Sequence, residues 1–196
     1  MEITITDSKC VRSKSDKFGF YQFEYFNVSV DSPEMASDEF KANVLDPTNY
    51  LLSSHNKNRS VYDLSQQDLV TETLKKFNKL AHEKILEYSK SSPMYKLFHL
   101  KAEKNIFTST INWDRPGFYQ GVHLDNHAII VQMIINLFDN NSQSTTLYMY
   151  DDDTHFDSGP LEKFRGLGFI NTAGATHGIG PVTQNRYTLY ALLEYN

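Results

Sequence analysis

The pattern of hydrophobic and polar residues changes between the two halves of the chain, and in the second half it has the short period of β-strands. Short β-prone runs recur from about residue 104 onward, separated by turn-forming Gly, Pro, Asn and Asp residues. The predicted strands are Ile106–Trp113, Gln120–Asp125, Ala128–Phe138, Ser144–Tyr150, Leu167–Asn171 and Arg186–Tyr195. Many short strands at near-regular spacing are typical of a sandwich or a jelly roll. We therefore predict a mainly β fold with supporting helices and a jelly-roll core.

The first half combines one long β-prone segment with helical patterns. Phe18–Val30 is aromatic and β-branched, which predicts a long strand or a hairpin. Asp31–Val44 begins with a cap residue and an early proline, which predicts a short helix, and Leu45–Ser60 is polar, which predicts a loop. The clearest helix is predicted to begin at Ser65 as its N-cap. Its apolar residues follow at helical spacing: Val70, Leu74, Phe77, Ala81, Ile85 and Tyr88.

The length of 196 residues is that of one domain. We expect a single domain over residues 1–196. Within it, residues 1–103 should provide a supporting strand and helix, and residues 104–196 should form the core.

Composition and charge restrict the class of function. The net charge is −5 and no run is rich in Lys or Arg, which argues against a nucleic-acid partner bound by charge. The single cysteine, Cys10, excludes an intramolecular disulfide and fits a reducing compartment. The N-terminus lacks a signal-peptide pattern, and no run approaches the roughly 20 apolar residues of a membrane span. We therefore expect a cytoplasmic protein without a membrane partner, and its oligomeric state stays open.

Two His-x-Asp pairs are candidate metal ligands. His123 and Asp125 lie two apart on a predicted strand, so their side chains share a face. The other pair, His155 and Asp157, lies in an acidic segment that we predict to be an exposed loop. Three predicted strands separate His123 from His177, enough to bring the chain back beside its start, whereas one separates His155 from it. Two His and one carboxylate is the ligand set of non-haem iron(II) oxygenases, so we predict His123, Asp125 and His177 as ligands. The alternative for the first pair is a surface ion pair.

Arg186 opens the last predicted strand, nine positions after His177. Thr188 and Tyr190 share its face, and both faces of this strand are largely apolar or aromatic, so we predict burial on both sides. A buried guanidinium is costly without a carboxylate partner. That partner is either an internal Asp or Glu or a bound dicarboxylate. The planar fork of Arg suits the latter, and Thr188 can add a hydroxyl donor.

The order of these residues resembles the signature of the 2-oxoglutarate/iron(II) dioxygenase superfamily, and most closely its prolyl 4-hydroxylase-like branch. The run Gly117-Phe-Tyr-Gln-Gly-Val-His-Leu-Asp125 is similar to that branch's approach to its metal. The ending is similar too, with His177-Gly-Ile-Gly-Pro-Val followed by Arg186-Tyr-Thr-Leu-Tyr. The resemblance covers about Lys104–Asn196.

The resemblance implies a double-stranded β-helix (jelly-roll) core that holds Fe(II) through the three predicted ligands. It implies 2-oxoglutarate as a co-substrate whose far carboxylate pairs with Arg186, O2 as oxidant and ascorbate as a candidate reductant. 2-Oxoglutarate would be decarboxylated to succinate while a substrate is hydroxylated. Related halogenases replace the carboxylate ligand by a small residue, so the presence of Asp125 favours hydroxylation.

The substrate stays open at this point. Prolyl hydroxylases usually have a Gly-Gly turn after the metal-binding strands, where this chain has Tyr150-Asp-Asp-Asp-Thr. The leading hypothesis is a hydroxylase of a prolyl residue in a peptide or protein. The alternatives are the same chemistry on a free amino acid, small metabolite or nucleobase, a non-catalytic metal-binding jelly roll, and a cupin-type enzyme that uses manganese or zinc.

A few further residues are weaker candidates for the site. Asn136 is expected to face inward and touch 2-oxoglutarate. Tyr119, four residues before the first ligand, either lines the pocket or belongs to the core. Trp113 and Arg115 either contact substrate or fill the edge of the core, which we favour. His127 is expected to lie beside the metal ligands without binding the metal itself, or to be exposed.

Overall fold

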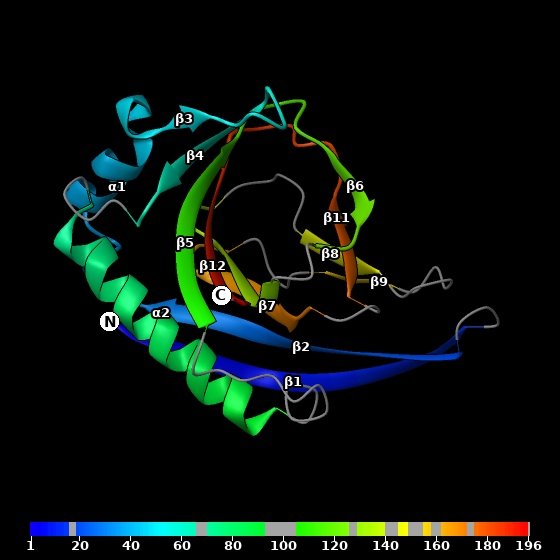
Figure 1. The fold of residues 1–196 in the computed structure, drawn as a ribbon. Coiled ribbons are helices and arrows are strands. Elements are labelled where there is room, and N and C mark those ends of the chain that lie inside the picture. Colours follow the sequence, from blue (N-terminus) through cyan, green and yellow to red (C-terminus); the bar gives the residue numbers. More distant parts are fainter. Residues whose placement is uncertain are drawn as a thin grey trace.

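A computed structural model describes most of the chain (Figure 1). It covers residues 1–15, 19–65, 70–92, 105–125, 129–139, 145–148, 155–157, 162–171 and 175–195. The helices are α1 (Asp38–Leu45), the 3-10 helix η1 (Pro47–Asn49) and α2 (Glu72–Ser91). The strands are β1 (Glu2–Ser15), β2 (Gly19–Asp31), β3 (Leu51–Leu52), β4 (Arg59–Asp63), β5 (Asn105–Asp114), β6 (Gln120–His123), β7 (Ile129–Asn136), β8 (Thr145–Tyr148), β9 (His155–Asp157), β10 (Arg165–Ile170), β11 (Thr176–Ile179) and β12 (Arg186–Tyr195).

Two antiparallel sheets make up the core. Among the described residues, the larger sheet has eight strands in the order β1-β2-β10-β7-β12-β5-β4-β3, and the smaller has four in the order β6-β11-β8-β9. Figure 1 shows the smaller sheet facing the curved larger one. This architecture confirms the predicted mainly β fold with a jelly-roll core. No helix in the described ranges combines the length and apolarity needed to cross a bilayer.

The last strand, β12, lies in the middle of the larger sheet between β5 and β7. Its residues alternate in direction, because successive side chains of a strand point to opposite faces. Tyr187, Leu189, Ala191 and Leu193 pack into the main hydrophobic core together with the apolar stripe of α2. The other face turns toward the smaller sheet. On it Arg186 and Thr188 are buried, as predicted, whereas Tyr190 and Leu192 are half-buried and line a cavity.

Helix α2 has the predicted apolar face but begins later than predicted. Leu74, Phe77, Ala81 and Ile85 are all buried. The N-cap is Thr71, whose hydroxyl accepts a hydrogen bond from the Leu74 backbone N–H, so the prediction of Ser65 as the cap is wrong. The cap position is decided by which hydroxyl reaches a free N–H of the first turn.

The N-terminal half contributes more strands than predicted. The predicted long strand corresponds to β2, and β1 pairs with it along its whole length as an antiparallel ribbon. The predicted loop over Leu45–Ser60 is wrong, because this segment contains η1, β3 and the start of β4. The short helix is α1, which begins after Ser37 rather than near Asp31, and the Ser37 hydroxyl accepts from the Phe40 N–H.

The segment His155–Asp157, predicted as a loop, is a strand. It forms β9, which pairs with β8 at the edge of the smaller sheet. Edge pairing of this kind depends on a neighbouring strand from elsewhere in the chain, and a three-residue run carries too little periodicity to predict it.

Strand β10 passes between β2 and β7 and needs glycine there. A Cβ at Gly166 would overlap the backbone carbonyl of Ile134 on β7, and a Cβ at Gly168 would overlap the ring of Phe26 on β2. A backbone neighbour cannot move aside as a side chain can, so Gly166 is the stricter of the two positions.

We predict that Gly166→Ala lowers the free energy of unfolding by about 3 kcal/mol, because overpacking against a fixed backbone strains the sheet. Urea denaturation followed by circular dichroism measures this. Gly121→Ala is the matched control, since its added Cβ would lie 3.4 Å from the Tyr119 hydroxyl, an ordinary contact. Equal stability of Gly166→Ala and the wild type would contradict the packing of β10 against β7.

Candidate metal centre

The three predicted metal ligands come together at the smaller sheet. His123 ends β6 and lies directly opposite His177 in the pairing of β6 with β11, and Asp125 follows two residues later. Asp125 Oδ1 lies 3.5 Å from His123 Nε2, and Asp125 Oδ2 lies 3.4 Å from His177 Nε2. One ligand atom from each residue lies within 4.8 Å of the others. Such a set can hold one divalent ion.

Backbone carbonyls orient both imidazoles. His123 Nδ1 lies 2.8 Å from the carbonyl oxygen of Gly121, and His177 Nδ1 lies 3.2 Å from that of Ala175. A carbonyl oxygen only accepts, so each Nδ1 carries a proton, and in the neutral form of each imidazole Nε2 keeps its lone pair. Both Nε2 atoms face Asp125, as a metal ligand set requires, and His123 Nε2 also lies 2.9 Å from Gln120 Nε2.

Asp125 is held as a carboxylate by its neighbours. Burial alone would raise its pKa, but in the metal-free protein the hydrogen bond with His123, attraction to the protonated form of His177 and a hydrogen bond from Gln132 together lower it below the ordinary value. The Asp125 hydrogen bond is also the main cause that raises the pKa of His123. Burial lowers the pKa of His177, which favours its neutral, metal-binding form. Gln132 is a supporting residue that the sequence analysis did not single out for this role.

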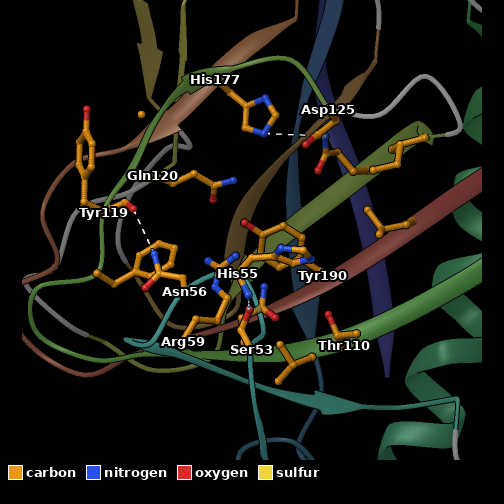
Figure 2. A pocket seen from close by; sticks show the side chains of 17 residues that line it. Ser53, His55, Asn56, Arg59, Thr110, Tyr119, Gln120, Asp125, His177 and Tyr190 are labelled. Atoms are coloured by element: carbon orange, nitrogen blue, oxygen red, sulfur yellow. Dashed lines mark hydrogen bonds and ion pairs between the residues drawn. The ribbon is translucent and has the colours of Figure 1, made fainter.

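A cavity of about 670 Å³ extends from the candidate metal ligands to the larger sheet (Figure 2). Asp125 and His177 belong to its wall on one side, and Arg59 and Tyr190 belong to the other. Tyr119 also lines it and is mostly exposed, so of its two predicted places the pocket is the one it takes. The remaining lining residues are Ser53, His55, Asn56, Val61, Thr110, Asn112, Phe118, Gln120, Gly121, Ile129, Gln132 and Leu192.

Arg186 has an internal carboxylate partner, one of the two alternatives that the sequence left open. Its guanidinium is 1% exposed, and Nη1 donates to Asp114 Oδ2 at 2.9 Å. Asp114 also accepts from Arg59, with Nε 2.6 Å from Oδ1 and Nη2 3.0 Å from Oδ2. Arg59 lines the cavity, and Arg186 is not among the lining residues. A contact between Arg186 and a bound dicarboxylate therefore stays a prediction.

Two buried polar groups beside this cluster lack partners. Asn136 on β7 and Thr188 on β12 are cross-strand neighbours, 3% and 0% exposed. Among the described residues, Asn136 Nδ2 and Thr188 Oγ1 make no hydrogen bond. A buried donor without an acceptor costs roughly 1–3 kcal/mol, and native proteins seldom leave one so. Neither residue is among those that line the cavity, so contact of Asn136 and Thr188 with 2-oxoglutarate stays a prediction.

Trp113 and Arg115, two of the weaker candidates, are not among the residues that line the cavity. Trp113 Nε1 donates to Asn185 Oδ1 at 3.2 Å, and Arg115 stacks on Trp113 with its guanidinium carbon 4.2 Å from the ring centroid. This supports the core-edge alternative for both. His127 lies outside the described residues. The competing pair His155-x-Asp157 lies on β9, separated from β11 by β8.

Comparison with known proteins identifies the fold. No family model matches the chain, and no curated protein sequence does. Solved structures do match. A Pseudomonas putida prolyl-4-hydroxylase aligns with a TM-score of 0.67 at 11% identity, covering 88% of this chain and 92% of that one.

Two further structures give the same picture. A prolyl hydroxylase from Trichoplax adhaerens, in complex with a hypoxia inducible factor oxygen degradation domain peptide fragment, aligns with a TM-score of 0.65 at 14% identity, covering 88% and 83% of the two chains. A 2OG-Fe(II) oxygenase family oxidoreductase from Burkholderia pseudomallei aligns at 0.51 with 13% identity, covering 84% and 79%. The chain therefore has the fold of the 2-oxoglutarate/iron(II) oxygenases, in the form that prolyl 4-hydroxylases display.

Proposed function

We propose that this protein is a 2-oxoglutarate- and Fe(II)-dependent oxygenase, and that it hydroxylates a prolyl residue in a peptide or protein. One observation carries the proposal: His123, Asp125 and His177 converge at one side of a cavity whose opposite wall holds a guanidinium. A metal site facing a cation across a cavity suits a co-substrate that chelates the metal at one end and is anionic at the other.

The metal would be held by His123 Nε2, His177 Nε2 and one oxygen of Asp125. Bound Fe(II) supplies the activation of O2 that hydroxylation needs, and three protein ligands leave open positions for small molecules. Gly121 and Ala175 keep the imidazoles in the required tautomer, and Gln132 holds the carboxylate in place. Supporting partners of this kind typically change metal affinity 10- to 100-fold when lost.

The far carboxylate of 2-oxoglutarate would lie near Arg186, Thr188 and Asn136. The fit rests on the two buried polar atoms without partners, because a carboxylate could accept from both the Asn136 amide and the Thr188 hydroxyl. Arg186 would add a positive charge beside them.

The substrate would enter at the side of the cavity formed by the β3–β4 turn and β6. Ser53, His55 and Asn56 on the turn and Tyr119 and Gln120 at β6 give this side hydrogen-bonding groups. Asn56 Nδ2 donates to the Tyr119 carbonyl oxygen at 3.4 Å and links the two segments. A peptide substrate is supported by the similar Trichoplax adhaerens structure, which is described in complex with a peptide. The alternative is the same chemistry on a free amino acid, small metabolite or nucleobase.

We predict that Asp125→Ala weakens Fe(II) binding on the order of 100-fold or more, because a carboxylate ligand contributes at least as much as its supporting partners. Anaerobic calorimetric titration of metal-free protein measures this. His155→Ala, which alters the competing His-x-Asp pair, should bind Fe(II) as the wild type does. If His155→Ala weakened Fe(II) binding and Asp125→Ala did not, the metal site would lie on β9 instead.

We also predict that adding 2-oxoglutarate to the Fe(II) protein without oxygen produces a visible metal-to-ligand charge-transfer band. In air, the same protein should convert 2-oxoglutarate to succinate, and a peptide substrate should gain the mass of one oxygen. The band reports chelation directly and needs no knowledge of the substrate. No band in folded, iron-loaded protein would falsify the oxygenase proposal and favour a cupin-type enzyme or a metal-binding sensor.

A further inference from the structure

A buried ion cluster joins the N-terminal half of the chain to the last strand. Arg59 on β4, Asp114 on β5 and Arg186 on β12 are directly paired in register across three neighbouring strands. Their side chains are 14%, 0% and 1% exposed. Backbone pairing thus fixes both guanidiniums beside one carboxylate, whichever ligand the cavity holds.

One carboxylate is shared between two guanidiniums. Asp114 Oδ2 accepts from Arg59 Nη2 at 3.0 Å and from Arg186 Nη1 at 2.9 Å. Asp114 carries a single negative charge and is shared by two guanidiniums, so these three side chains together keep a net positive charge. A net charge in a buried position is costly, and a second anion would relieve that cost.

Arg59 is the member of the cluster that reaches the cavity. It belongs to the cavity wall, whereas Asp114 and Arg186 do not (Figure 2). Asp114 engages Nε and Nη2 of Arg59, and the side chain of Tyr190 is a further hydrogen-bond partner of the guanidinium. A guanidinium has five N–H donors, so two donors remain for another acceptor. The aromatic rings of Phe118 and Tyr190 flank the guanidinium, with its carbon 4.2 and 5.9 Å from their centroids. The side chain is therefore held in one orientation before any ligand binds.

We infer that Arg59 contacts the far carboxylate of 2-oxoglutarate directly and that Asp114 positions Arg59 for this contact. Arg186, on the side of Asp114 away from Arg59, adds a second positive charge. This inference rests on the proposed function and adds a residue from the N-terminal half to the co-substrate site. It predicts selectivity for a 2-oxo acid with a second carboxylate over one that ends in a methyl group.

The test compares two ligands that differ only in that end group. Binding of 2-oxoglutarate and of 2-oxopentanoate to the Fe(II) protein is measured by anaerobic calorimetry, for the wild type and Arg59→Gln. We expect Arg59→Gln to weaken 2-oxoglutarate binding on the order of 30-fold or more, the loss typical of truncating one partner of a buried charged hydrogen bond. The affinity of Arg59→Gln for 2-oxopentanoate should stay within about threefold of the wild-type value, because that ligand has a methyl group in place of the far carboxylate.

Arg115→Gln is the matched control, because Arg115 lies on the turn after β5, stacks on Trp113 and does not line the cavity. It should leave both affinities unchanged. If Arg59→Gln does not fold, Arg59→Lys decides the question. It keeps a charge beside Asp114 but lacks the planar fork, so it should weaken 2-oxoglutarate binding alone, by about tenfold.

The outcomes separate this inference from the function on which it rests. If the wild-type protein does not bind 2-oxoglutarate, both are overturned. If it does, and Arg59→Gln or Arg59→Lys binds 2-oxoglutarate as tightly as the wild type, only the role of Arg59 is overturned. If an Arg59 variant lost affinity for 2-oxoglutarate and 2-oxopentanoate equally, the substitution would have distorted the site, and the proposed role of Arg59 would also be overturned.

Discussion

The structure depends on β12 being paired on both edges and covered on both faces, with only Tyr190 and Leu192 of its inward face open to the cavity. Its outward face forms the main core with α2, and its inward face carries Arg186 and Thr188 toward the smaller sheet. Polar side chains in such a position need partners inside the protein or in a ligand. The neighbouring strands supply some of them, as Asp114 does on β5, and they leave Thr188 and Asn136 with buried polar atoms that a ligand can satisfy.

The smaller sheet brings two histidines and a carboxylate close together. Antiparallel pairing of β6 with β11 places His123 opposite His177, although they are more than fifty residues apart in the chain. The short step from β6 to Asp125 completes the set, and carbonyl oxygens leave both Nε2 atoms available. The two sheets together thus present a candidate metal site and a guanidinium across one cavity, and this arrangement supports the proposed chemistry.

The N-terminal half is part of that arrangement as well as a support for it. Strand β4 pairs with β5, and this pairing brings Arg59 to Asp114 and into the cavity wall. The turn between β3 and β4 also lines the cavity, and Asn56 on this turn donates a hydrogen bond to the carbonyl oxygen of Tyr119. Segments before residue 104 therefore contribute both charge and hydrogen-bonding groups to the site.

The sequence by itself determined the β class, the alternation of β12, the apolar face of α2 and the three candidate metal ligands, because each of these is written in local periodicity or in residue order. It missed β1, β3, β4, β9 and β11. Of these, β4 and β11 pair with β5 and β6, which lie more than forty residues away in the chain, so no local pattern specifies them. It also had no means of choosing Asp114 as the partner of Arg186, or of singling out Arg59 within a segment that reads as a loop. Only the tertiary structure decided those points, because a buried charge finds its partner across strands whose register no local pattern specifies.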